Sequence, residues 1–173
     1  KGSGKLMDQA SPSISSVSLA ADNSSIVVSF SENVFNTASG SGALEASDFA
    51  LSVSGGTATL ASATPTAIVQ NGNSYTLSFS LTGTPDGSEV ISVAPIANSV
   101  YDGSGNLAST TQAKGSGKLM DQASPSISSV SLAADNSSIV VSFSENVFNT
   151  ASGSGALEAS DFALSVSGGT ATL

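Results

Sequence analysis

The sequence lacks the residues on which most enzyme chemistry depends. It has 173 residues and contains no cysteine, histidine or tryptophan. Without cysteine and histidine it cannot form a disulfide, a thiol nucleophile, a Ser-His-Asp relay or a zinc site built from nitrogen and sulfur ligands. Because it has only two tyrosines and no tryptophan, it also lacks the aromatic platforms of a sugar-cleaving cleft. We therefore expect a protein that is not an enzyme.

Positive charge is confined to one short motif. The four cations, Lys1, Lys5, Lys114 and Lys118, all lie in the two copies of KGSGKL, whereas residues 6–113 carry acids and no base. Thirteen acidic residues leave a net charge of −9. An acidic surface repels the phosphates of nucleic acid and attracts cations. We expect no nucleic-acid partner and no organic cofactor, and calcium is the ion to consider.

Nothing in the sequence predicts insertion into a membrane. There is no run of 18 apolar residues, and residues 1–30 lack the basic region and apolar stretch of a signal peptide. Charged residues make up only 10% of the chain, and the polar remainder is mostly serine, threonine, asparagine and glycine. This neutral, hydroxyl-rich composition is typical of secreted or surface β proteins. We expect a soluble, mature chain with an extracellular location.

Apolar and polar residues alternate through nearly every apolar segment. A period of two predicts strands with one buried face, and no long segment has the 3.6-residue period of a helix. About seven short strands separated by turn residues predict an all-β, immunoglobulin-like antiparallel β-sandwich. Residues 43–48 predict a turn or a single helical turn between its sheets. Strands are expected in residues 17–19, 26–30, 49–53, 57–61, 67–70, 75–81, 89–93 and 107–111.

The same alternation predicts which side chains form the core. In each strand, one set of alternate positions is apolar and the other is mostly polar. We expect the apolar sets of different strands to meet between the two sheets. The predicted core residues are Val28, Phe30, Leu51, Leu77 and Phe79.

Residues 114–173 repeat residues 1–60 letter for letter. Since surface positions of a fold tolerate many residues, such identity indicates either a recent gene duplication or a designed tandem repeat. We expect residues 1–113 to form one repeat unit, with a linker at about residues 1–10. The partial second copy, 114–173, would then hold the first half of the sandwich. The Gly-Ser-Gly of KGSGKL is typical of a flexible joint.

Half a sandwich cannot bury its apolar face, so the second copy needs a partner. Three possibilities are open. The chain is a window from a longer array; residues 61–113 fold with 114–173 as a circular permutant; or another chain completes the second copy.

Four motifs occur in the order seen in one known family. They are a proline that opens the first strand (Pro12), V-x-F-S-E at residues 28–32, A-S-D-F at residues 46–49 and D-x-x-G-N at residues 102–106. Over residues 8–112 the sequence resembles the bacterial Ig-like domains found as tandem arrays in S-layer proteins and large surface adhesins. The resemblance implies a secreted, non-enzymatic spacer or adhesive module of the bacterial cell surface, and it implies no particular ligand.

One segment offers oxygen ligands for calcium. Residues 102–106 place oxygen-bearing side chains at alternate positions, but the glycine and glutamate that an EF-hand needs next are absent. A looser calcium site is left open, in which Asp102 and Asn106 meet Asp121 and Glu145 at the joint between the copies. The alternative is an ordinary turn closed by Asp102, with solvated acids around it.

We expect the protein to act architecturally, as a structural repeat of a bacterial surface or secreted protein. It would space, extend or adhere, and it would assemble head to tail by half-domain complementation. Its partners would be neighbouring copies of the same repeat or chain and an unidentified surface ligand. Two alternatives stay open: an engineered concatemer or permutant built to polymerise, and a ligand- or carbohydrate-binding module.

Overall fold

The computed structural model describes residues 8–169 and contains two compact units, Lys1–Ala123 (unit 1) and Ser124–Leu173 (unit 2). All strand pairs among the described residues are antiparallel, and the described helices are two single turns, η1 and η2. The predicted all-β class is therefore confirmed. None of the described helices is long and apolar enough to cross a membrane.

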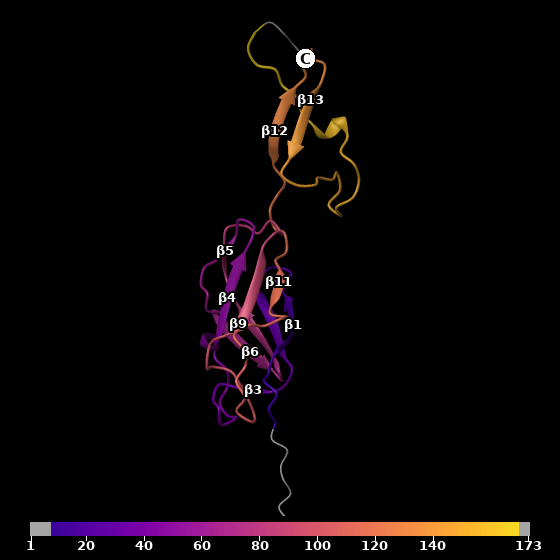
Figure 1. Ribbon diagram of the computed structural model, residues 1–173. Helices are drawn as coiled ribbons and strands as arrows, with labels where there is room; N and C mark the ends of the chain where they lie inside the picture. The colour runs from indigo at the N-terminus through magenta and orange to yellow at the C-terminus, as the bar shows by residue number, and fades with distance from the viewer. Residues whose placement is uncertain (1–7, 170–173) are drawn as a thin grey trace, which may run out of the picture. The chain divides into compact units, whose positions relative to one another are not determined.

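Unit 1 is a β-sandwich with two main sheets (Figure 1). The first sheet has the order β1 (Ile14–Leu19), β2 (Ser25–Phe30), β7 (Ser74–Ser78), β6 (Ala67–Asn71). The second has the order β11 (Ser116–Lys118), β9 (Val90–Pro95), β4 (Phe49–Ser54). Two short ribbons pair β10 (Tyr101–Asp102) with β3 (Val34–Phe35), and β5 (Thr59–Leu60) with β8 (Leu81–Thr82). The expected helical turn before β4 is η1 (Ala46–Asp48).

The core of unit 1 lies where the alternation predicts it. Strand β2 shows the pattern most clearly, since every second residue from Ile26 to Phe30 is buried. The predicted core residues Val28, Phe30, Leu51, Leu77 and Phe79 are each at most 5% exposed, so this prediction is confirmed.

Three aromatic rings join the two sheets. Phe30 on β2 and Tyr75 on β7 come from the first sheet, and Phe49 on β4 comes from the second. Their ring centroids lie 5.9–6.2 Å apart, and Phe30 meets Tyr75 edge to face. Tilted and edge-to-face pairs at this distance add to the stability that burial provides. This cluster therefore fixes how the first half of the unit packs against β7 from the second half.

Unit 1 extends beyond the sequence repeat. The repeat unit was expected to end at residue 113, but unit 1 runs to Ala123 and takes residues 114–123 from the second copy. Ser116–Lys118 form β11 on the edge of β9, so the expectation of a flexible joint is wrong for this copy of the motif. The first copy of the motif, residues 1–6, lies outside the described residues.

Two other expectations are corrected by the second half of unit 1. The strand expected at residues 107–111 is absent, because only Leu107 pairs there, in an isolated bridge with Tyr101. The last strand of unit 1 is instead β11, which pairs with β9. Residues 61–113 pair with residues 8–60 within unit 1, and the segment of the second copy that pairs with them is β11 alone among the described residues. The sandwich is therefore built on residues 8–60 and not on 124–169, so the chain does not fold as a circular permutant.

Unit 2 retains only the local part of this fold. Strands β12 (Ile127–Leu132) and β13 (Ile139–Phe143) pair in the same register as β1 and β2, and η2 (Ala159–Asp161) matches η1. Residues 162–167, which are identical to β4, form no strand. In unit 1 that strand pairs with β9, and residues 124–173 contain no copy of the β9 sequence. An identical sequence therefore forms a hairpin without help but forms β4 only when β9 is present.

Candidate functional site: an acidic cluster and an open apolar face

Three carboxylates from distant parts of the sequence meet in unit 1. Asp8 precedes β1, Glu32 follows β2, and Asp102 ends β10. One carboxylate oxygen of each lies within 4.8 Å of those of the other two. The sheets therefore hold three negative charges together, which is unfavourable unless a proton, a hydrogen bond or a cation offsets the repulsion.

Asp102 is stabilised by its own loop. Its carboxylate is completely buried and accepts hydrogen bonds from the main-chain N–H groups of Ser104 and Asn106, both at 2.8 Å, and from Nδ2 of Asn106 at 2.7 Å. Burial alone would raise the pKa of Asp102, but these hydrogen bonds outweigh it and hold the pKa below its usual value. Nδ2 of Asn106 also donates to the main-chain oxygen of Asp8 at 3.0 Å, which fixes the entering chain beside the loop.

Glu32 is the destabilised member of the cluster. Burial, followed by the negative charges of Asp102 and Asp8, raises the pKa of Glu32 above its usual value. A raised acid pKa means that the folded state binds this proton more tightly than the unfolded state does. Ionised Glu32 therefore destabilises unit 1 at neutral pH, and the destabilisation is relieved as the pH falls through the folded-state pKa.

The structure brings together only part of the expected calcium site. Asp102 and Asn106 lie together, because Nδ2 of Asn106 donates to the Asp102 carboxylate. Asp121 lies elsewhere in unit 1, beside Gly87, where a Cβ added to the glycine would be 3.0 Å from the Cβ of Asp121. Glu145 belongs to unit 2. The carboxylates beside Asp102 come from the first-copy counterparts of these two residues, Asp8 and Glu32. The offset of 113 positions between the copies was the signal that could have identified them.

The expectation of calcium therefore moves to Asp8, Glu32 and Asp102, whose all-oxygen donors suit that ion. We predict that Glu32→Gln raises the melting temperature of unit 1 in chelator by a few degrees, because it removes the repelled charge. In millimolar calcium the wild type should gain stability and the variant should not, since an ion that binds only the folded state stabilises it by mass action. Calorimetry in the two buffers measures both effects. If calcium does not change the melting temperature of the wild type, the prediction of a calcium site is wrong. If Glu32→Gln is less stable than the wild type in chelator, the prediction of charge repulsion at Glu32 is wrong.

Another buried carboxylate, Glu89, has a structural role. Its Oε1 accepts hydrogen bonds from the N–H groups of Thr57 and Ala58, both at 3.0 Å, and its Oε2 accepts one from Asp86 at 3.1 Å. Burial raises the pKa of Glu89, but main-chain hydrogen bonds, including those from Ala58 and Thr57, outweigh burial and hold this pKa below its usual value. Gly56 makes this possible, because a Cβ there would lie 2.2 Å from the Glu89 carboxyl carbon. Its hydrogen-bonding capacity is occupied by the loops, so it is not a free acid.

Unit 2 presents the apolar face that unit 1 buries. Ile127, Ile139, Phe162 and Leu164 are 57%, 40%, 37% and 58% exposed, whereas their counterparts Ile14, Ile26, Phe49 and Leu51 are at most 3% exposed. The rings of Phe143 and Phe162 still meet at 6.3 Å, close to the 6.2 Å between Phe30 and Phe49. The face is therefore arranged as in unit 1 but is not covered.

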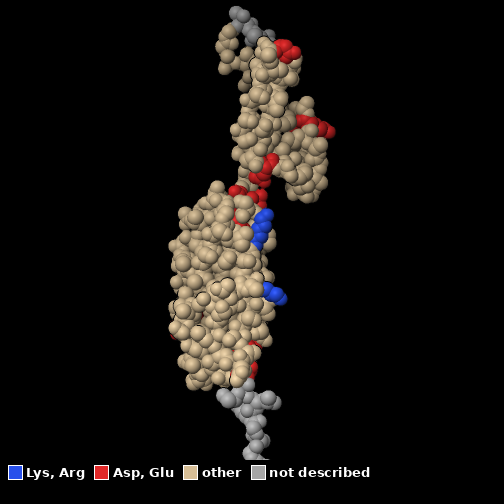
Figure 2. Space-filling view, in the orientation of Figure 1, with Lys and Arg blue, Asp and Glu red and all other residues tan. Residues whose placement is uncertain are grey.

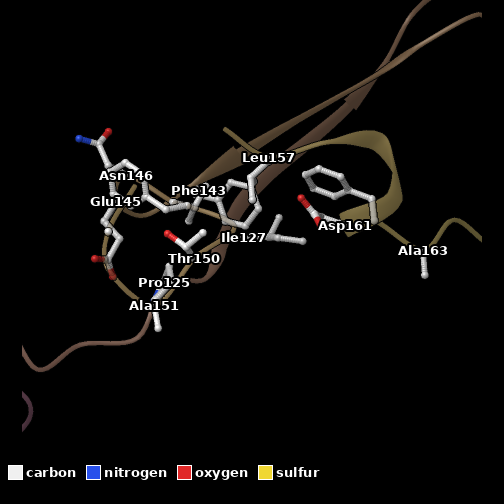
Figure 3. A pocket seen from close by; sticks show the side chains of 14 residues that line it. Pro125, Ile127, Phe143, Glu145, Asn146, Thr150, Ala151, Leu157, Asp161 and Ala163 are labelled. Carbon is white, nitrogen blue, oxygen red and sulfur yellow. The ribbon is translucent and has the colours of Figure 1, made fainter. Parts of the chain in front are cut away.

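A hollow opens at one end of this face. Ile127 and Phe143 line it from the hairpin, and Leu157 lines it from the following loop, as Figure 3 shows. Pro125 and Phe162 also line it. In unit 1 the counterparts of these five residues all belong to the buried interior. The hollow is therefore the unfilled part of a core and not a site shaped for a small ligand.

No protein-family model, curated protein or solved structure matches the chain.

Proposed function

We propose that the chain is part of a bacterial Ig-like structural repeat without enzymatic activity, which spaces and extends a secreted or cell-surface protein. The path of the chain through unit 1 is the observation that supports this most. The chain enters beside Asp102, where Asn106 holds the main chain of Asp8, and it leaves beside Pro85, whose carbonyl accepts a 2.9 Å hydrogen bond from the N–H of Gln122. These places lie at opposite ends of unit 1 (Figure 1).

Units entered at one end and left at the other follow one another in series. The joint is also short, because Leu119 is still buried in unit 1 and β12 begins at Ile127. A joint of this length adds little flexible chain, whereas long flexible linkers behave as coils. The repeat is therefore suited to adding length to a protein.

The strand topology supports the Ig-like assignment. In chain order the seven strands of the main sheets are β1, β2, β4, β6, β7, β9 and β11. Labelled A to G, they form one sheet in the order A-B-E-D and another in the order G-F-C. This is the arrangement of constant-type immunoglobulin domains. In it β11, from the second copy of KGSGKL, occupies the place of strand G.

The surface of unit 1 favours an architectural role over ligand recognition. Its described cations are Lys114 and Lys118, and the face seen in Figure 2 carries few charged side chains between its ends. Some hydroxyl side chains on its strands bond to main chain or to one another: Ser15 donates to the carbonyl of Ser29 at 2.9 Å, and the hydroxyls of Ser29 and Ser74 lie 2.7 Å apart. A ligand site needs convergent polar groups in a concave pocket.

The serial arrangement can be tested with chains of two, four and eight complete repeats. We expect the maximum dimension measured by small-angle X-ray scattering to grow in proportion to the number of repeats. Growth as the square root of that number would indicate freely jointed units, because flexible chains extend in that way. Such a result would contradict the role as an extender.

The proposal includes assembly with neighbouring copies. The open face of unit 2 has the sequence and the hairpin register of a face that residues 61–123 cover in unit 1. A polypeptide with that sequence is therefore the partner that fits it. The same fit would serve an engineered concatemer, so this step does not depend on the origin of the repeat.

A further inference from the structure

A strand from the second copy completes unit 1 through main-chain hydrogen bonds. β11 pairs with β9 at Ser116–Lys118, and the pairing continues at both ends. The N–H of Val93 donates to the carbonyl of Gly115 at 2.6 Å, and the N–H of Leu119 donates to the carbonyl of Glu89 at 3.0 Å. Without residues 114–119 this side of β9 would be an unpaired edge, which is a template for another strand.

The glycines of the motif are required by close packing. A Cβ on Gly115 would lie 2.4 Å from the carbonyl oxygen of Val93, and a Cβ on Gly117 would lie 2.6 Å from Cδ1 of Leu19. The first clash is with main chain and cannot be relieved by a side-chain rotation. The glycines of Gly-Ser-Gly therefore allow the segment to fit into a narrow groove between β9 and β1. Close packing, and not a need for flexibility, accounts for glycine at these two positions.

Two anchors follow the glycines. Leu119 is 2% exposed and belongs to the core. Beyond it, the buried side chain of Asn23 clamps the main chain of Met120: its Oδ1 accepts from the N–H at 2.9 Å and its Nδ2 donates to the carbonyl at 2.8 Å. The groove thus has room only for glycine at residues 115 and 117, and it buries the side chain of Leu119. It binds Met120 through main-chain hydrogen bonds.

The clamp keeps its shape in the second copy. Asn23 has a positive φ of 56°, and its counterpart Asn136 in unit 2 has a φ of 59°. Asn136 is exposed. The turn therefore keeps the same backbone conformation at this asparagine when no strand is bound to it, which reduces the backbone entropy lost on binding.

We propose that the groove between β9 and β1, closed by Asn23, is a binding site for the segment Lys-Gly-Ser-Gly-Lys-Leu-Met, and that it accepts this segment from a second copy of the chain. Residues 114–120 supply it within the chain, and residues 1–7 have the same sequence. Each molecule can then act as an acceptor, through its groove, and as a donor, through residues 1–7. The site rests on the closing strand and not on the spacer role, so its failure would leave the serial arrangement of units untouched.

Occupancy is set by competition between the two sources. Residues 114–120 are tethered to the groove by the chain itself, which gives them an effective concentration in the millimolar range. Residues 1–7 of another molecule are present only at the protein concentration. The wild-type groove is therefore filled from within, and binding between molecules appears when the internal strand cannot dock.

Gly115→Val in the full chain tests the proposal, because it blocks the internal strand and leaves residues 1–7 intact. We expect this variant to bind a labelled peptide of sequence KGSGKLMDQA at least about 100-fold more tightly than wild type does. We also expect it to form concentration-dependent oligomers in sedimentation experiments. The matched control is Gly2→Val, which should remain like wild type, and the double variant should bind peptide but not self-associate.

A folding defect in Gly115→Val does not weaken the test. If the variant is partly unfolded, the peptide should restore its near-ultraviolet circular dichroism and raise its melting temperature, whereas a KVSGKLMDQA peptide should not. Absence of both peptide binding and rescue would overturn the proposal. Equal rescue by the two peptides would overturn the assignment of the groove. Leu119→Asp, which removes the buried anchor, should behave like Gly115→Val.

Discussion

Phe30→Ala is expected to lower the unfolding free energy of unit 1 by about 4 kcal/mol, whereas Phe143→Ala should change the stability of the chain by less than about 1 kcal/mol. The two substitutions are made in identical sequences. Phe30 is 1% exposed and packs against Phe49 and Tyr75, so its loss removes buried apolar surface and leaves a cavity. Among the described residues, Phe143 has one aromatic neighbour, Phe162, and it lies on an uncovered face.

Thermal and denaturant unfolding of both variants measure the contrast. A loss of about 4 kcal/mol corresponds to a fall of roughly 15–30 °C in the melting temperature of a domain of this size. Because the two local sequences are the same, intrinsic strand propensity cancels in the comparison. A similar loss from both variants would mean that unit 2 is already covered in solution, and a small loss from both would mean that the aromatic cluster is not the core.

Alternation was enough to predict the sandwich and the core, because burial of one strand face is a local property of the sequence. Val28 and Phe30 needed only a period of two to be placed correctly. The closing strand could not be found in this way. Gly115 and Gly117 have no side chains to alternate, and their place depends on the main chain of Val93 and the side chain of Leu19, which are close only after folding.

Only part of the acidic cluster could be predicted from the sequence. Asp102 and Asn106 were predicted as a pair because they lie four residues apart. Asp8 and Glu32 reach Asp102 only through the pairing of β3 with β10 and the fixed entry of the chain, which link residues about 70 to 95 positions apart. Sequence spacing carries no information about such distances when no related sequences are at hand. The repeat was the one feature that could have linked them.

The identical copies also separate what local sequence determines from what long-range contacts determine. The β1–β2 hairpin reappears as β12–β13 with the same register and with the same irregularity before Ser16 and Ser129. The strand of residues 49–54 does not reappear at 162–167. A hairpin closes over a short loop at small entropic cost, whereas β4 needs a partner about 40 residues away. The first hairpin is therefore determined by local sequence, whereas β4 forms only when its partner strand is present.

Exchange between chains cannot supply that complement without loss elsewhere. Residues 1–173 hold two first halves, 8–60 and 121–173, and one second half. When one molecule lends residues 61–123 to the unit 2 of another, its own residues 8–60 become uncovered. The number of complete sandwiches does not change, so the burial of apolar surface does not favour exchange. A second half that continues from Leu173 is the source that adds a complete domain.

The second large effect is therefore expected when the sequence of residues 61–123 is added after Leu173. Unit 2 should become a cooperatively folded domain, with a second unfolding transition and slow hydrogen exchange in residues 127–132 and 139–143, because the added strands cover Phe143 and Phe162 as β7 and β9 cover Phe30 and Phe49. In this longer chain Phe143→Ala should cost about 3–5 kcal/mol, like Phe30→Ala. Adding the same residues with Gly and Ser at the counterparts of Tyr75 and Leu77 is the control. If the added sequence left unit 2 as rapidly exchanging as before, residues 61–123 would not be the partner that its open face fits.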